Sequence, residues 1–301
     1  MTYKNMDAAL SAFFDHELRQ VMARSYDVVY PELHARTLFP VSSEISAGAE
    51  SFVYDQYDFV GVAKLIHSYA SDLPSVEITG KQFVRQVFSE GICFKYSFQD
   101  VRAAQFAGKP LNDRKARAAR RQMLALENKI AFHGDAEAGI PGFIQYPNIL
   151  TRDTTAAWND ANVILAALED AINFQNEQTY GAEQSNILVV PEKYYIYMAM
   201  KRFNEYSDLS LLDYIVQKFP YIEQVISCHE LMGADPDGYD CAMLYRRDPD
   251  KLTMEIPQDV EFFDAQQDGF MFKVPVHART AGVVVYSPLS VIRINDIGNE
   301  G

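Results

Sequence analysis

Three groups of residues carry side chains that could perform chemistry, and the first lies at 133–137. His133, Asp135 and Glu137 have the atoms needed to ligate a metal ion or to exchange protons. Their alternate spacing suits an extended segment, whereas this stretch follows a predicted helix end and enters a glycine-containing turn. A structural interpretation is favoured, because a histidine at a helix C-terminus meets the negative end of the helix dipole and Gly134 ends the helix. We therefore predict no metal ligand and no catalytic residue here.

A second group lies near residue 230 and consists of Cys228, His229, Glu230 and Cys241. Its spacing does not match the paired C-x-x-C ligands of structural zinc sites. We expect a cysteine in the core and a histidine in a loop.

The third group is the sequence Asp-Pro-Asp-Gly-Tyr-Asp at 235–240, which resembles the opening of a calcium-binding loop. Tyr239 stands where such a loop needs an oxygen ligand, and no glutamate occupies the closing position. The stretch therefore predicts a Pro-Asp-Gly turn between strands.

The motifs of common enzymes are missing from the chain. None of the 15 glycines forms G-x-G or the phosphate-binding G-x-x-x-x-G-K, and no serine stands in G-x-S-x-G. We predict no catalytic, cofactor-binding or metal-binding residues, and no cofactor. One enzymatic alternative stays open, because catalytic sites are assembled in space: a cytosolic α/β enzyme that uses scattered residues such as His133, Asp135, His229 and His277. It requires a deep pocket that holds several of these side chains together.

The composition bounds the class of protein. A chain of 301 residues with 48% hydrophobic and 23% charged residues can form one large domain or two intimate ones. A net charge of −14 argues against a protein that wraps nucleic acid, which needs clustered Lys and Arg in excess. The three scattered cysteines suit a reducing cytoplasm. The longest apolar runs are far shorter than the roughly 20 residues of a membrane span, and the N-terminus lacks the pattern of an export signal.

The first 98 residues predict elements that have little support from their own neighbours. Apolar residues at helical spacing predict an amphipathic helix over 7–24, and an extended arm follows it. Residues 49–98 have strand-like ends, separated by about twenty mostly small and polar residues that include Pro74 and Gly80. This pattern predicts a projecting hairpin. Because a long two-stranded hairpin is only marginally stable alone in water, we expect a neighbouring chain to support it.

The longest predicted helix runs from Asn112, which caps it, to His133, and spans roughly 33 Å. One stripe of this helix is apolar and consists of Ala116, Ala119, Met123, Leu126 and Ile130. Arg114, Arg117 and Arg121 fall on the opposite side, and six Lys or Arg against two Asp or Glu give the helix a local charge of +4. Two interpretations stay open: a solvated helix face, or contact with an anionic partner such as packaged nucleic acid or an acidic assembly factor.

The second half of the chain alternates helices and strands. A helix over 156–178 that ends near Gly181 is predicted from apolar residues at helical spacing, namely Trp158, Ala161, Leu165, Leu168 and Ile172. The elements expected after it are a buried strand at 186–190, a helix from Pro191 to Phe203, a helix at 209–219, a strand at 241–245 and further strands from Lys251 onward. No repeat and no flexible linker divides these elements.

This α+β order of elements resembles the major capsid proteins of tailed bacteriophages and the related encapsulin shell proteins, which share the Hong Kong 97-type fold. The resemblance covers nearly the whole chain. At 111–149, a long helix ends in the phrase E-N-x-x-x-x-x-G and runs into G-I-x-G. The stretches at 187–222 and 246–262, and the final strands at 278–294, carry the rest of the resemblance.

The resemblance implies a shell subunit without a catalytic site. The implied divisions are 1–48 for the N-terminal helix and arm, 49–98 for the extended β-hairpin loop (E-loop) and its base, 99–150 with 246–279 for a peripheral (P) domain with the spine helix 112–133, and 151–245 with 280–301 for an axial (A) domain. The turn at 129–149 would carry the chain from the peripheral to the axial domain. Gly134, Gly139 and Gly142 would then serve the backbone geometry of this turn.

The resemblance also implies partners and a location. The chain would self-assemble through hexamers and pentamers into the icosahedral head of a tailed bacteriophage around double-stranded DNA, which it touches by loose non-specific contact. Scaffolding, portal and decoration proteins are further implied partners, the location is the virion capsid after assembly in the host cytoplasm, and no membrane is involved. An encapsulin-like compartment for a cargo enzyme is the alternative. Lys64 and Lys81 lie in the hairpin region, but no asparagine partner is identifiable, so no covalent cross-link is predicted.

Overall fold

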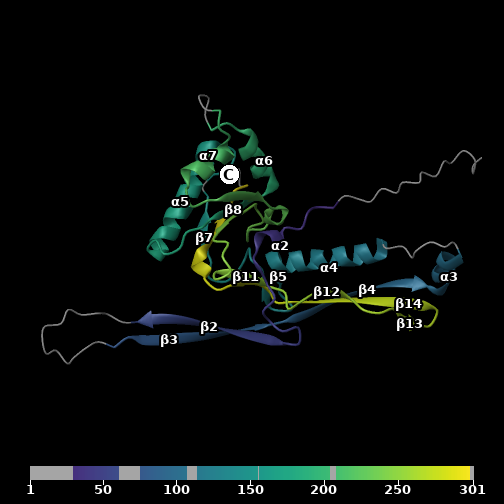
Figure 1. The fold of residues 1–301 in the computed structure, drawn as a ribbon. Coiled ribbons are helices and arrows are strands. Elements are labelled where there is room, and N and C mark those ends of the chain that lie inside the picture. The colour runs from purple at the N-terminus through teal and green to yellow at the C-terminus, as the bar shows by residue number, and fades with distance from the viewer. Residues whose placement is uncertain (1–29, 61–74, 107–113, 155, 204–207, 299–301) are drawn as a thin grey trace, which may run out of the picture. The chain divides into compact units, whose positions relative to one another are not determined.

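The computed structural model describes residues 30–60, 75–106, 114–154, 156–203 and 208–298 (Figure 1). The chain divides into two units, residues 1–32 and 33–301, and every element described below belongs to the second. The helix expected over 7–24 lies outside the described residues, as do Asn112, Pro74 and Lys64. The expected mixture of helices and strands is confirmed.

The helices are α2 (Ala35–Leu38), α3 (Phe98–Phe106), α4 (Arg114–His133), α5 (Ala161–Thr179), α6 (Glu192–Met200) and α7 (Leu211–Lys218), with the short 3-10 helices η1 (His229–Leu231) and η2 (Pro288–Ser290). The strands of the first half are β1 (Val41–Ser42), β2 (Ser51–Val60), β3 (Glu77–Gln86), β4 (Phe88–Ser97), β5 (Gly134–Asp135), β6 (Ile140–Pro141) and β7 (Leu150–Asp153). Those of the second half are β8 (Ile187–Val190), β9 (Gln224–Ser227), β10 (Ala242–Tyr245), β11 (Leu252–Glu255), β12 (Gln258–Phe262), β13 (Gln266–Asp268), β14 (Met271–Thr280), β15 (Gly282–Val285) and β16 (Val291–Asn295).

A five-stranded sheet with the order β7-β16-β10-β8-β9 is buried on both faces. Its three central strands are antiparallel, whereas the edge strands β7 and β9 run parallel to their neighbours. Successive side chains of β8 point to opposite faces of the sheet and pack in two different cores. Leu188 and Val190 pack in the first core, with residues of α5, α6 and α7, whereas Ile187 and Val189 pack in the second core. The continuous apolar run thus belongs to a strand buried on both sides, as predicted.

Helix α5 begins later than its apolar pattern predicted. Asp160 accepts a hydrogen bond from the backbone amide of Asn162 at 2.7 Å, so Asp160 caps the helix and the helical residues start after it. Trp158 therefore precedes the helix, although it is buried in the same core as the predicted stripe. The helix ends at Thr179, close to the predicted end.

The two helices that follow lie within the predicted ranges 191–203 and 209–219. Helix α6 starts after Pro191 but ends at Met200, before the expected Phe203. Helix α7 starts after Ser210, whose hydroxyl oxygen accepts a hydrogen bond from the backbone amide of Asp213 at 3.1 Å.

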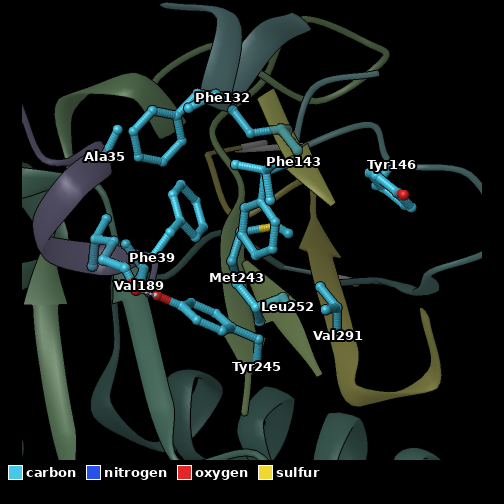
Figure 2. Packing of buried hydrophobic residues seen from close by; sticks show 14 of the residues in the cluster. Ala35, Phe39, Phe132, Phe143, Tyr146, Val189, Met243, Tyr245, Leu252 and Val291 are labelled. Atoms are coloured by element: carbon cyan, nitrogen blue, oxygen red, sulfur yellow. Dashed lines mark hydrogen bonds between the residues drawn. The ribbon is translucent and has the colours of Figure 1, made fainter. Parts of the chain in front are cut away.

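The second core joins the five-stranded sheet to the sheet β1-β11-β15, to α2 and to the end of α4. Its aromatic rings meet edge to face, with centroids 4.7 Å apart for Phe39 and Phe143 and 5.1 Å apart for Phe143 and Tyr245 (Figure 2). The Tyr245 hydroxyl donates a hydrogen bond to the carbonyl of Leu38 at 2.8 Å, and burial raises the pKa of this phenol. Both apolar packing and a hydrogen bond therefore attach α2 to this core.

A further sheet contains the long strand β14. This strand pairs over its whole length with β4 on one side, and with β12 and β13 on the other. Helix α4 covers one face of the sheet, where Ala119 and Met123 pack with Val276 and Ala278 of β14.

Helix α4 ends at His133 as predicted, and its described part begins at Arg114. The predicted apolar stripe is wrong at one position, because Leu126 is 41% exposed whereas the next residue, Glu127, is only 4% exposed. At 3.6 residues per turn, the row that faces the protein is 119, 123, 127 and 130. A charged residue in a buried row requires a partner.

The strands β2 and β3 form a separate antiparallel ladder to which each contributes ten residues. The predicted hairpin is confirmed, but its returning strand differs from the expectation. Gly80, expected in the connection, lies within β3 opposite Tyr57, so the connection covers only 61–76. The strand-like end of the stretch, residues 88–97, forms β4 and pairs with β14 rather than with β2.

Candidate functional site

The first predicted group, His133, Asp135 and Glu137, lies where α4 passes into the small β5–β6 hairpin. Asp135 Oδ1 accepts hydrogen bonds from the backbone amides of Glu137 at 2.9 Å and Ala138 at 3.1 Å. This carboxylate oxygen therefore stabilises the backbone of the turn. Across the described ranges, no three His, Cys, Asp or Glu residues are grouped so that they could hold a metal ion.

The same turn depends on close approach of the backbone. Gly134 has a φ of +72°, and a Cβ atom on it would lie 2.3 Å from the carbonyl oxygen of Ile140. A Cβ atom on Gly142 would lie 2.2 Å from the carbonyl carbon of His133. No side chain fits at either distance, which confirms the predicted role of these glycines in backbone geometry.

The structure brings together two side chains that the sequence placed in separate groups. His133 Nε2 lies 3.5 Å from Glu230 Oε2, and Asn128 Nδ2 donates a hydrogen bond to Glu230 Oε1 at 2.6 Å. The hydrogen bond with His133 is the largest cause of the lowered pKa of Glu230. The contact joins the last turns of α4 to η1, and no spacing along the chain could indicate it.

The two cysteines of the second group are free thiols in the second core. Burial raises the pKa of Cys228 and of Cys241 to about 12, which disfavours the thiolate that nucleophilic attack or metal binding needs. The sequence predicted one core cysteine, and the structure places both in the core. His229 differs from the expected loop histidine, because it is the exposed first residue of η1.

The stretch at 235–240 is the predicted turn. Asp235 Oδ1 accepts hydrogen bonds from the backbone amides of Asp237 at 3.0 Å and Tyr239 at 2.7 Å. Asp240 Oδ1 accepts one from the backbone amide of Gly233 at 2.9 Å. These carboxylate oxygens are therefore bonded to backbone amides of the turn.

The arginine face of α4 lies away from the sheet that the helix covers. Arg114 and Arg117 are exposed and Arg121 is half-buried, whereas Ala119 and Met123 are buried against β14. This exposure agrees both with a solvated face and with contact to an anionic partner.

A charged cluster that the sequence analysis missed attaches α2 to α4. Arg36 donates hydrogen bonds through Nε and Nη2 to both carboxylate oxygens of Glu127, at 2.6 and 2.7 Å, and through Nη2 to Asp259 of β12 at 2.7 Å. The bond to Glu127 is the largest cause of the raised pKa of Arg36. The backbone amide of Ala35 donates to Asn128 Oδ1 at 2.9 Å. We call Arg36, Glu127, Asn128 and Asp259 the arm joint.

A signal for half of the arm joint was present in the sequence. Glu127 and Asn128 are the first two residues of the phrase E-N-x-x-x-x-x-G, and they are 4% and 3% exposed. A polar pair in the buried row of a helix indicates partners from elsewhere in the chain. The partner of Glu127 is Arg36, which lies 91 residues away in the sequence, and no local sequence pattern connects these two residues.

The β2–β3 hairpin carries an apolar surface, which we call the hairpin face. Its members lie on one side of the ladder, where Asp55, Gly80 and Gln82 stand between them, and are Val53 (50% exposed), Tyr57 (60%), Ile78 (63%) and Val84 (62%). The other side is packed at its base, where Tyr54 stacks on Phe83 with centroids 5.2 Å apart and meets Tyr286 edge-on at 5.0 Å. The chain itself therefore supports one side of the hairpin, and the hairpin face stays open.

The enzymatic alternative requires a pocket lined by its scattered residues. One cavity, of about 460 Å³, is lined by Arg152, Asp153, Asp170 and apolar side chains of α5 and β16. Three smaller cavities, of about 330, 320 and 110 Å³, are lined by residues of the hairpin, of the β5–β6 turn and of the C-terminal part of α5. In these four cavities the lining includes none of His133, Asp135, His229 and His277.

Comparisons with known proteins agree with this fold. A family model described as major capsid protein matches residues 61–297. The capsid of Myoviridae phage XM1 matches with a TM-score of 0.79 at 16% identity, over 93% of this chain and 97% of that one. The capsid of an empty GTA particle matches with a TM-score of 0.63 at 14% identity, over 94% of this chain and 97% of that one. A virus-like particle from Pyrococcus furiosus matches with a TM-score of 0.58 at 13% identity, over 86% of this chain and 91% of that one. These likenesses confirm the expected Hong Kong 97-type fold, and no curated protein matches the sequence.

Proposed function

The chain belongs to the major capsid protein family, and from this premise we propose that it assembles through hexamers and pentamers into the icosahedral head of a tailed bacteriophage. The family makes the protein a structural component of a capsid. The observation that supports assembly through this particular surface is the hairpin face, a row of exposed apolar side chains on a ladder of two strands.

A second copy of the chain is the proposed occupant of the hairpin face. Each of its four side chains is about half exposed, and burying the remainder contributes roughly 1 kcal/mol per side chain, or about 4 kcal/mol in total. Joining two chains costs about 4–15 kcal/mol in lost translational and rotational freedom. A single hairpin contact is therefore too weak for a stable dimer. A closed ring, in which every copy both gives and receives a hairpin, overcomes this cost.

The domain divisions implied by the resemblance are proposed here as 1–48, 49–98, 99–150 with 246–279, and 151–245 with 280–301. The five-stranded sheet supports the axial assignment, since β8, β9, β10 and β16 lie within it and β7 starts at its boundary. The packing of α4 on β14 supports the peripheral assignment. The pairing of β4 with β14 anchors the base of the E-loop in the peripheral sheet.

Double-stranded DNA is the proposed content of the shell. A net charge of −14 opposes tight binding of phosphates, which supports loose and non-specific contact with the packaged genome. The arginine face of α4 is the local exception, and an anionic partner of this face would be DNA or an acidic assembly factor.

The remaining proposed partners are scaffolding, portal and decoration proteins, and the proposed place of assembly is the cytoplasm of the bacterial host. In the described part of the chain, none of the helices combines the length and apolar character needed to cross a bilayer. The rival proposal, an encapsulin-like shell around a cargo enzyme, uses the same fold. Neighbouring genes distinguish the two, because terminase and portal genes accompany a phage head whereas a cargo gene accompanies a compartment.

Two substitutions on the hairpin face test the proposal. Ile78→Asp and Val84→Asp, combined, place charges in the surface that we assign to a second copy, while both positions are exposed in the single chain. We expect a folded subunit by circular dichroism but a loss of rings and shells by sizing chromatography and negative-stain electron microscopy. Thr79→Asp combined with Gln56→Asp is the matched control, because it adds the same two charges at exposed positions on the opposite side of the ladder.

Closed shells from the double variant at the yield of the unmodified chain would refute the assignment. Deletion of 64–77, most of which lies outside the described residues, is a coarser version of the same test. It should likewise give a folded subunit that does not assemble.

A further inference from the structure

Tyr180 stands at a backbone position that is unfavourable for its side chain. It follows the last residue of α5 and has a φ of +51°, in the left-handed region where helices most often place glycine. The other two non-glycine residues with a positive φ in the described ranges are Asn148 and Asp296, and asparagine and aspartate adopt this conformation more readily. A tyrosine there is sterically strained, although a glycine, Gly181, comes directly after it.

Contacts within the chain do not offset this strain. Tyr180 is 98% exposed, the largest exposed fraction among the large hydrophobic side chains that the structure describes. Stability alone would favour glycine at such a position, since glycine adopts the left-handed region without strain. Backbone strain that persists at an exposed side chain indicates a function, and exposed tyrosines are frequent anchors of protein interfaces.

A groove beside the N-terminal half of α5 has the shape to receive a tyrosine. Helix α5 runs beside the edge strand β7 (Figure 1), and the cavity of about 460 Å³ that both elements line has Val163, Ala166 and Ala167 on its helical side. We call this cavity the α5 groove. Its small side chains leave room for an aromatic ring. Because β7 is the last strand of the five-stranded sheet, no strand in the described part of the chain covers its outer edge.

The polar residues of the α5 groove match a phenol. Arg152 Nη2 donates a hydrogen bond to Asp170 Oδ1 at 2.8 Å, and the guanidinium lies over the ring of Phe174 at 4.4 Å from its centroid. These two contacts hold the guanidinium in place while Arg152 and Asp170 stay partly exposed. A phenol ring can pack on the alanines, and its hydroxyl can accept a hydrogen bond from Arg152 and donate one to Asp170.

Other strongly exposed apolar side chains fit the α5 groove less well. Phe106 (97% exposed), Phe270 (86%) and Met200 (82%) have no hydroxyl group for the pair of Arg152 and Asp170. Tyr180 has both the ring and the hydroxyl, so it is the occupant that the chemistry of the groove favours.

Tyr180 cannot enter the α5 groove of its own chain. At 1.5 Å per residue, the rise of α5 from Ala166 to Thr179 is roughly 20 Å. A contact between the two places must therefore join two copies, and it joins two different surfaces. Such heterologous contacts close into a ring when each copy gives one surface and receives the other.

We propose that Tyr180 of one copy inserts into the α5 groove of the next copy around a ring of subunits. This inference rests on the proposed assembly and adds to it a contact that is separate from the hairpin face. The phenol ring packs on Ala166 and Ala167, and its hydroxyl bonds with the pair of Arg152 and Asp170. The strained conformation of Tyr180 is kept because the side chain is needed between copies.

Tyr180→Gly tests the contact, because it removes the side chain and the strain together. The single subunit should keep its circular dichroism spectrum and melt at the same temperature or higher. A closed ring has one such contact per copy. The protein concentration at which half of the chains assemble should therefore rise about thirtyfold, as for the loss of one interface hot spot. Sizing chromatography over a concentration series and negative-stain electron microscopy measure this shift.

Tyr239→Ser is the matched control, because it removes a tyrosine that is 41% exposed from another turn. Its assembly should resemble that of the unmodified chain. An equal rise in the assembly concentration for the two variants would overturn the specific contact.

Chemical cross-linking tests the same contact with Tyr180 intact. Cysteines replace Asn162, which is exposed in the first turn of α5, and Ala182, which is exposed close to Tyr180, in a chain that also carries Cys93→Ser. A short bis-maleimide cannot join the two ends of α5 within one chain. We expect a ladder of linked species that ends at the pentamer and hexamer on a denaturing gel. Each single-cysteine variant can link at most two copies.

The outcomes distinguish this inference from the proposed function. Shells from the unmodified chain, together with Tyr180→Gly shells at the same concentration, would overturn the inference and leave the proposed function standing. So would shells whose cross-linked species end at the dimer, and the α5 groove would then belong to a different partner. An unmodified chain that forms neither rings nor shells would refute the proposed function and this inference with it.

Discussion

Replacement of Arg36 by methionine tests how strongly the arm joint holds α2. Arg36 bonds both carboxylate oxygens of Glu127, whose side chain is 5% exposed. The Arg36→Met change keeps the aliphatic part of the side chain but removes the guanidinium. A buried carboxylate is then left without its ion-pair partner.

The size of the effect follows from the burial of the two partners. Removal of one partner of a buried ion pair costs about 3–5 kcal/mol. The Arg36 side chain is 35% exposed, so water reaches the vacated place and the lower value, about 3 kcal/mol, applies. At about 2 °C per kcal/mol for a chain of this size, the Tm should fall by about 6 °C. Asp259→Asn is the control, because Asp259 is 59% exposed and its ion pair is worth about 1 kcal/mol or less.

Differential scanning fluorimetry at fixed protein concentration and neutral pH measures these shifts. The double variant Arg36→Met with Glu127→Leu removes the buried charge together with its partner, so it should recover most of the lost Tm. A single variant that melts within about 2 °C of the unmodified chain would refute the reasoning. So would a double variant that melts below the Arg36→Met variant.

Two further predictions concern the turn after α4 and the cysteines. Gly134→Ala should destabilise the chain by more than about 2 kcal/mol, because the added Cβ would overlap facing backbone atoms. Gly139→Ala should cost only about 1–2 kcal/mol, because Gly139 has a positive φ but open space around it. Chemical denaturation compares the two variants, and equal losses of stability would contradict the clash at Gly134. In the native chain a maleimide should label only the exposed Cys93, whereas Cys228 and Cys241 should react only after unfolding. Burial raises the pKa of both thiols to about 12, which disfavours the reactive thiolate. Mass spectrometry locates the label, and labelling of either buried thiol in the native chain would contradict the packing of the core.

The sequence by itself determined the features that depend on neighbours along the chain. The apolar run at 187–190 indicated a buried strand, and helical spacing indicated α4 and α5. The glycines at 134 and 142 indicated a tight turn, and the separation of two strand-like segments indicated a hairpin. These signals are local, because they arise from side-chain periodicity and backbone conformation.

Only the tertiary structure decided which distant segments meet. The pairing of β4 with β14, the arm joint and the contact of His133 with Glu230 join residues far apart in the sequence, and periodicity contains no information about such partners. The phase of α4 was also set by packing: one residue corresponds to about 100° around a helix, so Glu127 rather than Leu126 lies inward. There the carboxylate is stable because Arg36, brought from another part of the chain, bonds it on both oxygens.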